Sequence, residues 1–139
     1  MANWDKRYLD LAFFIAKWSK DPVRKVGAVL CREGVNISMG FNGFPSAIKD
    51  SPEILANKAE KRKRVIHAEV NAILKAKERP DTAYVTLLPC TQCLVLLMQA
   101  GVTRIVCPEP DYSKTSDWDV TLVLDLIDES GLDIEFLEL

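Results

Sequence analysis

The sequence predicts an α/β domain of three layers, α/β/α, built on a five-stranded mixed sheet. Two β-prone runs, residues 26–31 and 35–41, are joined by the short polar turn Arg32-Glu33-Gly34, which is typical of an antiparallel hairpin. From residue 67 onward, helical and β-prone segments alternate, which is typical of parallel strands connected by helices. The 139 residues fit a single domain spanning 1–139, because domains usually contain about 100–200 residues.

An amphipathic helix is predicted before the hairpin, over residues 4–18. Its apolar residues recur mostly at steps of three and four, and they are Trp4, Tyr8, Leu11, Ala12, Ile15 and Trp18. After the hairpin, residues 42–51 are rich in Gly, Asn and Pro and predict a loop. A helix is then expected from Ser51-Pro52, with Ser as N-cap and Pro at the first helical position, to about Val65.

The rest of the chain is expected to alternate between helices and strands. Helices are expected over residues 67–77, 90–100 and 118–130, and strands over residues 83–88, 104–107 and 134–137. Such alternation predicts helices packed on both faces of the sheet. Because a full helix separates the last two strands, these strands are expected to run parallel, whereas a hairpin would need only a tight turn.

The overall composition argues against several classes of protein. The 18 Lys and Arg residues are balanced by 20 Asp and Glu residues, which gives a net charge of -2. Proteins that bind polymeric DNA or RNA usually carry an excess of basic residues, so such a partner is not expected. The N-terminus lacks the apolar core of a signal peptide, and no apolar run approaches the roughly 18 residues of a membrane span. A cytoplasmic protein without a membrane partner is therefore expected. A chain of this length can bury a core without disulfides or metal, so any metal site is free to be functional.

A candidate metal site lies in two short segments, His67-Ala68-Glu69 and Pro89-Cys90-Thr91-Gln92-Cys93. Zinc prefers imidazole nitrogen and thiolate sulfur, and a catalytic zinc keeps three protein ligands and leaves its fourth position to water. His67, the only histidine, would supply these three ligands together with Cys90 and Cys93. The two cysteines are three residues apart at a predicted helix start, so they can reach one ion, and the helix N-terminus favours their thiolates.

The spacing of His67 and Glu69 sets a condition on the local backbone. On a regular helix with about 3.6 residues per turn, side chains two positions apart diverge by about 200°. Both side chains can serve one site only if His67 lies at the non-helical entrance of the helix. Glu69, beside the open metal position, can then act as the acid and base that moves protons between water and substrate.

Two other interpretations of these segments stay open at this point. A Cys-x-x-Cys that opens a helix after a strand is also the arrangement of a thiol-disulfide redox centre, which would reduce disulfides and hold no zinc. A structural zinc module would unfold on chelation and would keep every function after a Glu69→Gln substitution. Cys31 and Cys107 lie on predicted core strands, where a free cysteine is usually a small buried hydrophobe.

Four stretches of the chain resemble the deoxycytidylate deaminase branch of the cytidine deaminase superfamily, and the resemblance covers nearly the whole sequence. They are Ser19-Lys20-Asp21-Pro22 with Val26-Gly27-Ala28-Val29, Gly40-Phe41-Asn42-Gly43-Phe44-Pro45, His67-Ala68-Glu69 with Asn71-Ala72-Ile73, and Pro89-Cys90 with Cys93. The last two are similar to zinc motifs shared with guanine, tRNA-adenosine, cytosine and riboflavin-pathway deaminases. The first two are similar to stretches typical of the nucleotide branch.

The resemblance implies a cytidine deaminase-like fold and hydrolytic deamination of dCMP to dUMP and ammonia, which supplies thymidylate synthesis. It implies that His67, Cys90 and Cys93 hold zinc, while Glu69 carries a proton to N3 and then to the leaving amine. The implied substrate contacts are Val26 on the pyrimidine face, the Ala68 backbone at the ring edge, Asn42 at the sugar 3′-hydroxyl, Tyr112 near the sugar-phosphate and Lys20 at the phosphate. The nearest alternative is deamination of another base, such as cytosine, deoxycytidine or a tRNA adenosine.

The 5′-phosphate site is where this chain departs from the family pattern. Relatives often carry an Arg immediately before the Ser-Lys-Asp stretch, and this chain has Trp18 there. Lys20, Arg24 and Lys25 are the candidate replacements, with solvated surface cations as the alternative. A run of five cations before the zinc motif is either a solvated face or a phosphate-binding surface, and its members are Lys58, Lys61, Arg62, Lys63 and Arg64.

The resemblance also implies regulation and assembly. Members of this family form homo-oligomers, typically hexamers, that dCTP activates and dTTP inhibits, with the nucleotide bound together with magnesium. The nearest candidates for this regulatory site follow the hairpin, and they are Gly43, Phe44, Pro45, Ser46 and Asp50. Asp50 would offer the oxygen ligand that Mg²⁺ prefers. Residues 46–66 contain no Cys or His, so the second zinc site of some longer relatives is not expected.

Overall fold

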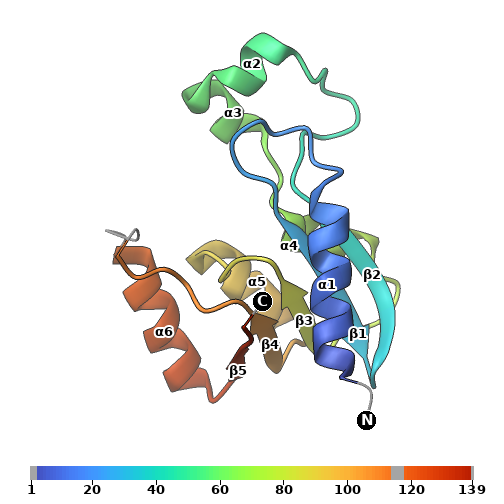
Figure 1. Cartoon of the computed structure of the whole chain (residues 1–139), viewed down its shortest axis with the longest axis vertical. Coiled ribbons are helices and arrows are strands. Elements are labelled where there is room, and N and C mark those ends of the chain that lie inside the picture. Colours follow the sequence, from blue (N-terminus) through green and yellow to red (C-terminus); the bar gives the residue numbers. More distant parts are fainter. Residues whose placement is uncertain (1–2, 114–117, 139) are drawn as a thin grey trace.

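Five strands form one mixed sheet in the order β2-β1-β3-β4-β5 (Figure 1). The computed structural model describes residues 3–113 and 118–138. The strands are β1 (Gly27–Arg32), β2 (Val35–Phe41), β3 (Thr82–Val85), β4 (Arg104–Cys107) and β5 (Asp133–Phe136). Strand β1 pairs antiparallel with both β2 and β3, whereas β3, β4 and β5 run parallel. The predicted hairpin and the predicted parallel pairing of the last two strands are both confirmed.

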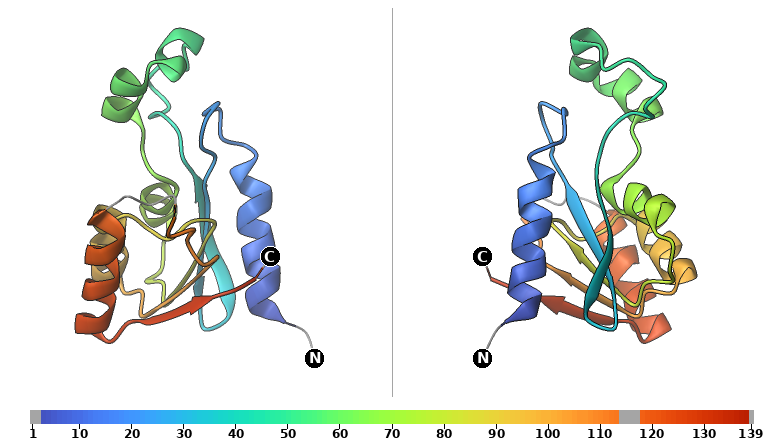
Figure 2. Two further views of the ribbon diagram at one scale, coloured as in Figure 1. Left: turned by 60° about the vertical axis from the view of Figure 1, so that its left-hand side comes forward. Right: turned by 90° about the vertical axis from the view of Figure 1, so that its right-hand side faces the viewer.

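Helices cover both faces of this sheet, which confirms the three-layer prediction. Helix α1 (Trp4–Ala16) packs on one face, and α4 (Ala68–Lys75), α5 (Thr91–Ala100) and α6 (Trp118–Ser130) lie on the other (Figure 2). Alternate residues of β1 divide accordingly, because successive strand side chains point to opposite faces. Val29 packs with the buried residues of α1, while Ala28 and Leu30 pack with those of α4, α5 and α6.

The two helices that connect the parallel strands lie on the same face of the sheet. Helix α5 connects β3 to β4, and α6 connects β4 to β5. Because both right-handed crossovers step in the same direction along the sheet, both connecting helices fall on one side. The opposite face is covered by α1, which precedes the first strand. The first helix is therefore needed to bury the second face.

The single helix expected from Ser51-Pro52 to about Val65 is wrong, because two short helices occupy this segment. Helix α2 spans Pro52–Ala56 and α3 spans Lys58–Arg64. Between them, Asn57 has an extended backbone with φ -93° and ψ 102°. Its side-chain oxygen accepts a hydrogen bond from the backbone N–H of Glu60 at 3.2 Å. Asparagine competes for backbone groups in this way and favours a helix cap over a helix interior.

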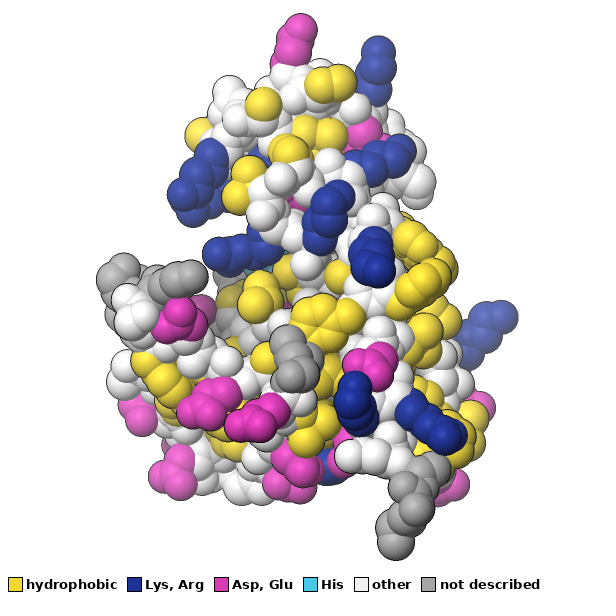
Figure 3. All heavy atoms as spheres, in the orientation of Figure 1, with side chains coloured by type: hydrophobic (Ala, Val, Ile, Leu, Met, Phe, Trp, Pro, Cys, Tyr) yellow, Lys and Arg dark blue, Asp and Glu magenta, His cyan; other side chains and the backbone are white. Residues whose placement is uncertain are grey.

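Helices α2 and α3 form an arm, residues 52–64, that projects beyond one end of the sheet (Figure 1). At its base, Gly43 and Ile66 pair through two backbone hydrogen bonds of 3.1 and 2.7 Å. Lys61 of α3 also forms a buried ion pair of 3.0 Å with Asp21, in the segment after α1. Lys and Arg side chains gather on this arm and around the hollow below it (Figure 3). The arm therefore brings positive charge to the end of the sheet.

Other element boundaries differ from expectation by only a few residues. The strand expected over residues 83–88 ends at Val85, and the helix expected over residues 67–77 begins at Ala68 and ends at Lys75. Within residues 3–113 and 118–138, none of the helices combines the length and the hydropathy that crossing a bilayer requires.

Candidate active site

His67 lies at the entrance of α4, where the spacing argument requires it. It is the N-cap residue, with φ -68° and ψ 154°, and its carbonyl oxygen accepts the first helical hydrogen bond from Asn71 at 3.0 Å. Because the N-cap backbone is extended, the imidazole turns away from the helix and toward α5. Glu69 follows in the first helical turn, so the two side chains reach the same region although they are two positions apart.

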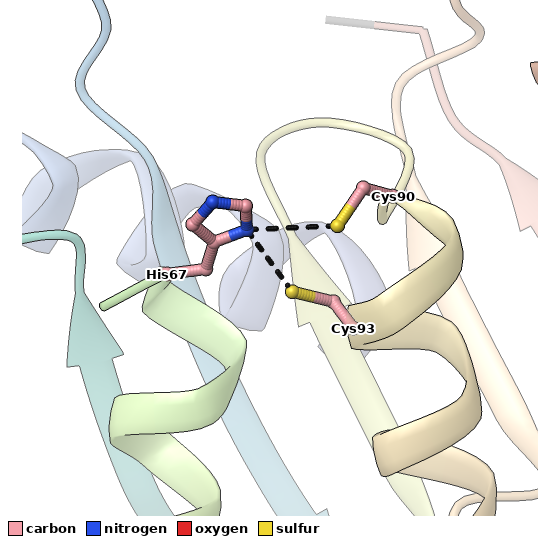
Figure 4. A group of neighbouring side chains, drawn as sticks. All are labelled: His67, Cys90 and Cys93. Atoms are coloured by element: carbon pink, nitrogen blue, oxygen red, sulfur yellow. Dashed lines mark hydrogen bonds between the residues drawn. The ribbon is translucent and has the colours of Figure 1, made fainter. Parts of the chain in front are cut away.

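Cys90 and Cys93 stand at the start of α5, opposite His67 (Figure 4). Cys90 is the N-cap residue of this helix and Cys93 lies in its first turn. The Nδ1 atom of His67 is 3.2 Å from the Cys93 sulfur and 3.5 Å from the Cys90 sulfur. The three donor atoms all lie within 4.8 Å of one another. Helices α4 and α5 begin side by side at one end of the sheet. His67, Cys90 and Cys93 therefore lie together although His67 is distant from the cysteines in sequence.

These three donors fit a zinc ion. In a tetrahedral site with zinc–ligand bonds of about 2.0–2.3 Å, neighbouring donor atoms are about 3.3–3.8 Å apart. The His67–Cys90 distance of 3.5 Å falls in this range, and the His67–Cys93 distance of 3.2 Å is slightly shorter. One imidazole and two thiolates are also the donor set of known catalytic zinc sites with three protein ligands. His67, Cys90 and Cys93 would hold the ion, and its fourth position would face the cavity beside them.

The surroundings of the two sulfur atoms favour a thiolate at Cys90. A hydrogen bond from Cys93 lowers the pKa of the Cys90 thiol, burial raises it, and hydrogen bonds from His67 and the Cys93 backbone lower it further. The net effect is a pKa well below the ordinary value for cysteine. The hydrogen bond with Cys90 correspondingly raises the pKa of His67. The hydrogen bond to Cys90, together with burial, raises the pKa of the Cys93 thiol, so that without a metal the pair keeps one proton. Zinc ligation requires both sulfurs to be deprotonated.

Glu69 is a buried carboxyl group beside the three donors. Only 4% of its surface is exposed. Burial raises the pKa of Glu69, hydrogen bonding to its own backbone N–H opposes the change, and the charge of Cys90 raises the pKa further. The net shift is upward, which suits a group that takes up and releases a proton near neutral pH. The structure therefore places a buried carboxyl group with a raised pKa beside the three donors, in the lining of one cavity.

A cavity of about 310 Å³ lies beside the candidate metal donors and Glu69. Three of the residues expected at the substrate, Val26, Asn42 and Ala68, line it together with His67, Glu69 and Cys90. The other lining residues are Asp21, Val23, Arg24, Lys58, Lys61, Arg62, Val65, Leu87 and Leu88. Apolar side chains near the metal donors and cations from the arm give the cavity one apolar part and one basic part. This combination fits a flat ring that carries an anionic group.

Asn42 shapes the wall of this cavity. Its side-chain oxygen accepts a hydrogen bond from the backbone N–H of Val26 at 2.8 Å, and its amide nitrogen donates to the Arg24 carbonyl at 2.9 Å. The Ser19 hydroxyl in turn donates to the Asn42 carbonyl at 2.8 Å. An amide nitrogen has two hydrogens, so one remains for a bound hydroxyl group. These contacts explain why a Ser-Lys-Asp-Pro stretch and a Gly-Phe-Asn-Gly stretch occur in one chain.

Four cations line the cavity, and they differ in their partners. Lys61 is held by Asp21 at 3.0 Å, with only 12% and 8% of the two side chains exposed. Arg24, Lys58 and Arg62 line the same cavity and form no ion pair within the part of the chain that the structure describes. Their positive charge is therefore available to a bound anion.

Other residues expected at the phosphate lie elsewhere. Lys20 is exposed and forms an ion pair of 2.9 Å with Asp50. Lys25 donates a hydrogen bond to the Ser19 carbonyl. Trp18, which replaces the Arg of relatives, packs edge-on against Phe41 with ring centres 6.1 Å apart. None of these side chains lines the cavity.

The remaining expected site residues lie outside the cavity lining. Tyr112 is 49% exposed and does not line the cavity. Gly43 uses its backbone to pair with Ile66, and the loop that carries Phe44, Pro45 and Ser46 connects β2 to the arm without lining the cavity. Asp50 faces Lys20. The regulatory role of this loop stays a prediction.

Some cavity residues could not be assigned from the sequence. The cation run over residues 58–64 is visible in the sequence, but only the fold shows that Lys58 and Arg62 line the cavity whereas Lys63 pairs with Glu60 at 3.6 Å. Val65, Leu87 and Leu88 carry no local pattern that distinguishes a cavity wall from a core. Their role follows from the return of two chain segments to the same end of the sheet.

Comparisons with known proteins agree with this geometry. The family model described as the cytidine and deoxycytidylate deaminase zinc-binding region matches residues 2–109. An uncharacterised deaminase of the luxG 3′ region in Aliivibrio fischeri is 33% identical over 143 residues, covering 100% of this chain and 97% of the relative. The deoxycytidylate deaminase of Homo sapiens is 32% identical over 125 residues, covering 83% of this chain and 70% of the relative.

Solved structures share the fold. The dCMP deaminase from the cyanophage S-TIM5, in complex with dCMP and dUMP, aligns with a TM-score of 0.75 over 95% of each chain at 24% sequence identity. A mutant cytidine deaminase from Mycobacterium tuberculosis aligns with a TM-score of 0.55 at 15% identity, covering 80% of this chain and 88% of that one. The family match includes His67, Cys90 and Cys93, the three residues whose donor atoms converge at the cavity. The chain therefore belongs to the cytidine and deoxycytidylate deaminase family.

Proposed function

We propose that this protein hydrolyses dCMP to dUMP and ammonia. The observation that carries the proposal is a cavity lined both by His67, Cys90 and the buried Glu69, next to Cys93, and by the cations Arg24, Lys58, Lys61 and Arg62. Relatives named deoxycytidylate deaminase support the choice of substrate. The reaction consumes one water, breaks the C4–N bond and releases the amino group as ammonia, so no oxidant or reductant is needed. A redox role for Cys90 and Cys93 is disfavoured because both lie in the stretch that matches a zinc-binding family model.

Zinc, when bound by His67, Cys90 and Cys93, would lower the pKa of a water molecule and so supply a hydroxide nucleophile near neutral pH. Glu69 would accept a proton from the attacking water and deliver it to N3 of the cytosine ring, while the water oxygen bonds to C4. The same carboxyl group would then take the remaining proton from the oxygen added at C4 and pass it to the amino nitrogen, so that the C4–N bond breaks, the C4 carbonyl forms and ammonia leaves. A buried carboxyl with a raised pKa suits this shuttle, because it can hold the proton between the two transfers.

The pyrimidine ring would lie between the apolar cavity wall and the start of α4. Val26 supplies an apolar surface for the ring face, and the backbone at Ala68 offers hydrogen-bonding groups to the ring edge. The remaining N–H of the Asn42 amide would donate to the sugar 3′-hydroxyl, because its other polar groups are already paired. These contacts would orient C4 toward the metal donors and N3 toward Glu69.

The 5′-phosphate would lie at the mouth of the cavity, near Arg24, Lys58 and Arg62. These cations line the cavity without a carboxylate partner among the described residues. A phosphate monoester carries close to two negative charges at neutral pH, and charge-assisted hydrogen bonds to Arg and Lys are the usual means of binding it. This arrangement would let the arm supply the charge that relatives with an Arg in place of Trp18 provide from another position.

Regulation and assembly are part of the same proposal. dCTP as activator and dTTP as inhibitor, with Mg²⁺, would act at the loop that contains Gly43, Phe44, Pro45, Ser46 and Asp50. This loop connects β2 to the arm, so a ligand there could alter the position of the cavity cations. A homo-hexamer and a place in thymidylate precursor synthesis in the cytoplasm complete the proposed role. Tyr112 would approach the sugar-phosphate only after its segment moves toward the cavity.

The decisive experiment compares dCMP, deoxycytidine and dCTP as substrates of the zinc-loaded protein, by the loss of cytosine absorbance. We expect dCMP to be preferred over deoxycytidine, because deoxycytidine has no phosphate to pair with the cavity cations. Turnover of deoxycytidine with equal kcat/KM would contradict the phosphate site but leave the chemistry intact. No deamination of any of the three by zinc-loaded protein would overturn the proposed reaction. Addition of dCTP or dTTP with Mg²⁺ tests regulation in the same assay.

A further inference from the structure

The first turn of α5 presents a structural problem, because its N-cap residue is a metal ligand. A helix begins with backbone N–H groups that have no partner inside the helix, and the side chain of the N-cap residue usually accepts from one of them. Cys90 makes no such hydrogen bond. Its sulfur faces His67 at 3.5 Å instead. The acceptor for this helix end must therefore come from another part of the chain.

Asp119, in the first turn of α6, provides this acceptor. One carboxylate oxygen, Oδ2, accepts the backbone N–H of Thr91 at 3.2 Å, and the other, Oδ1, accepts the Thr91 hydroxyl. Thr91 directly follows Cys90 and lies two positions before Cys93. The carboxylate therefore holds Thr91, between the two cysteines, from a different helix, with one oxygen on its backbone N–H and the other on its hydroxyl.

We propose that Asp119 is a positioning residue for the zinc centre, acting through Thr91 as a substitute cap for α5. Because Asp119 satisfies the helix end, Cys90 is free to direct its sulfur at the metal. The proposal rests on the zinc site proposed above. Loss of this contact lets the Cys90 segment move, so that the three donors spend less time at zinc-binding distances. Groups that orient metal ligands in this way typically change metal affinity by about 10–100-fold when removed.

The packing of both helices separates this role from general stability. Helix α5 is held by Leu94 and Leu97, which are both 0% exposed, and α6 by Val123, which is 1% exposed, and Ile127, which is 5% exposed. These apolar contacts remain when the Asp119 carboxylate is removed. A substitution at Asp119 is therefore expected to change the position of Thr91 and Cys90 far more than the packing of α5 or α6 on the sheet.

The test is the zinc affinity of the full-length protein, measured by competition with a chromophoric chelator. Asp119→Ala removes both hydrogen bonds to Thr91 and is expected to weaken zinc binding by about 10–100-fold. Thr91→Val removes only the hydroxyl hydrogen bond and is expected to weaken zinc binding by a smaller factor. Thr91→Ser retains the hydroxyl and is expected to keep wild-type affinity. Asp125→Ala is the matched control, because it removes the same charge from an exposed position on the same helix. The double variant is expected to bind zinc no more weakly than Asp119→Ala alone, because Asp119→Ala already removes both hydrogen bonds.

Several outcomes would overturn the proposal. Wild-type zinc affinity in both Asp119→Ala and Thr91→Val would show that the contact does not position the ligands. An equal loss in Asp125→Ala would assign the effect to helix charge. A wild-type protein that takes up no zinc would overturn the metal site and this role together, whereas wild-type uptake with unchanged variants overturns the positioning role alone. If Asp119→Ala does not fold, the comparison of Thr91→Val with Thr91→Ser decides.

Discussion

At the scale of single residues, Glu69 is the most constrained group in the proposed site. Its carboxyl is 4% exposed and lies beside the metal donors, at the bottom of the cavity that contains Val26 and Asn42. Burial of a carboxyl without a cation partner costs stability, so its retention is explained by a chemical role better than by a structural one. A catalytic zinc centre needs such a carboxyl group beside the metal, whereas a structural zinc centre does not, so Glu69 is the residue that distinguishes the two hypotheses.

Glu69→Gln is predicted to abolish dCMP turnover while zinc stays bound. Glutamine has nearly the same shape but cannot take up and release a proton, so kcat is expected to fall by about 10²- to 10⁴-fold or more. Zinc content by metal analysis is expected to match the wild type, because Glu69 is not among the three donors. Wild-type turnover in this variant would contradict the proton-shuttle role.

Gly40 is a second residue whose identity the structure explains. A Cβ atom at this position would lie 2.6 Å from the Ala68 carbonyl oxygen and 2.6 Å from the Ala72 backbone nitrogen. Both contacts are to the backbone of α4, so neither can be relieved by a rotation of a side chain. The glycine lets β2 and α4 approach closely, and this approach sets the position of His67 and Glu69.

Gly40→Ala is therefore predicted to lower both stability and activity. Displacement of α4 is expected to cost about 1–3 kcal/mol in the free energy of unfolding, measured by urea denaturation, together with a loss of kcat. Gly43→Ala is the stability control, because a Cβ atom there meets nothing within 4 Å. Equal stability of both variants would show that α4 can move without cost.

At the scale of elements, the arm formed by α2 and α3 determines the charge of the cavity. Its five cations have different surroundings although they are close in sequence. Lys61 is buried against Asp21, Lys63 and Arg64 pair with Glu60, and Lys58 and Arg62 line the cavity. A helix turns about 100° per residue, so neighbouring side chains necessarily point in different directions.

Arg62→Ala and Lys58→Ala are predicted to raise KM for dCMP and to leave kcat nearly unchanged. Loss of one charge-assisted hydrogen bond to phosphate is expected to lower kcat/KM by about 10- to 100-fold. Lys63→Ala is the matched control on the same helix, because its side chain is 72% exposed and does not line the cavity. The same effect on deoxycytidine, which has no phosphate, would argue against this assignment.

At the scale of the whole molecule, one ion-pair network joins the N-terminal helix to the parallel half of the sheet. Arg104 of β4 donates to both oxygens of Asp5 in α1, at 2.9 and 2.6 Å, and to Glu135 of β5 at 2.5 Å. The Tyr84 hydroxyl of β3 also donates to Asp5 at 2.8 Å. Four elements far apart in sequence therefore meet in this network.

This network predicts a specific loss of stability in acid. The hydrogen bond from Arg104 lowers the pKa of Asp5 below its ordinary value of 3.8, although burial opposes the shift. The unfolded chain therefore binds a proton at Asp5 more readily than the folded protein. The stabilisation is fully present above the unfolded pKa and is lost as the pH falls through the lower folded pKa.

Asp5→Asn is predicted to lower the free energy of unfolding by about 1–2 kcal/mol at neutral pH. The difference from the wild type is expected to shrink below about pH 4, as the carboxyl of the wild type becomes neutral like the amide of the variant. Urea unfolding of both proteins across this pH range measures the difference. Lys6→Ala breaks an exposed pair with Asp10 and is expected to leave stability unchanged. A difference that stays constant down to about pH 2 would contradict the linkage.

The sequence alone determined the order of most helices and strands, the hairpin and the metal donors. Each of these depends on short-range patterns: apolar residues at a helical period in α1, two β-prone runs with a short turn, and ligands at fixed spacing at helix starts. The condition that His67 lies at a helix entrance also follows from local geometry. Such features are predictable because a helix or strand presents side chains with a fixed period.

The tertiary structure alone decided which charged side chains meet. Lys20, next to the family motif, pairs with Asp50, while Lys58 and Arg62 from a cation run line the cavity. The contact between Asp119 and Thr91 likewise depends on how distant segments return to one end of the sheet. A long charged side chain has many conformers of similar energy, so its partner is selected by the packing of the whole chain and not by its neighbours in sequence.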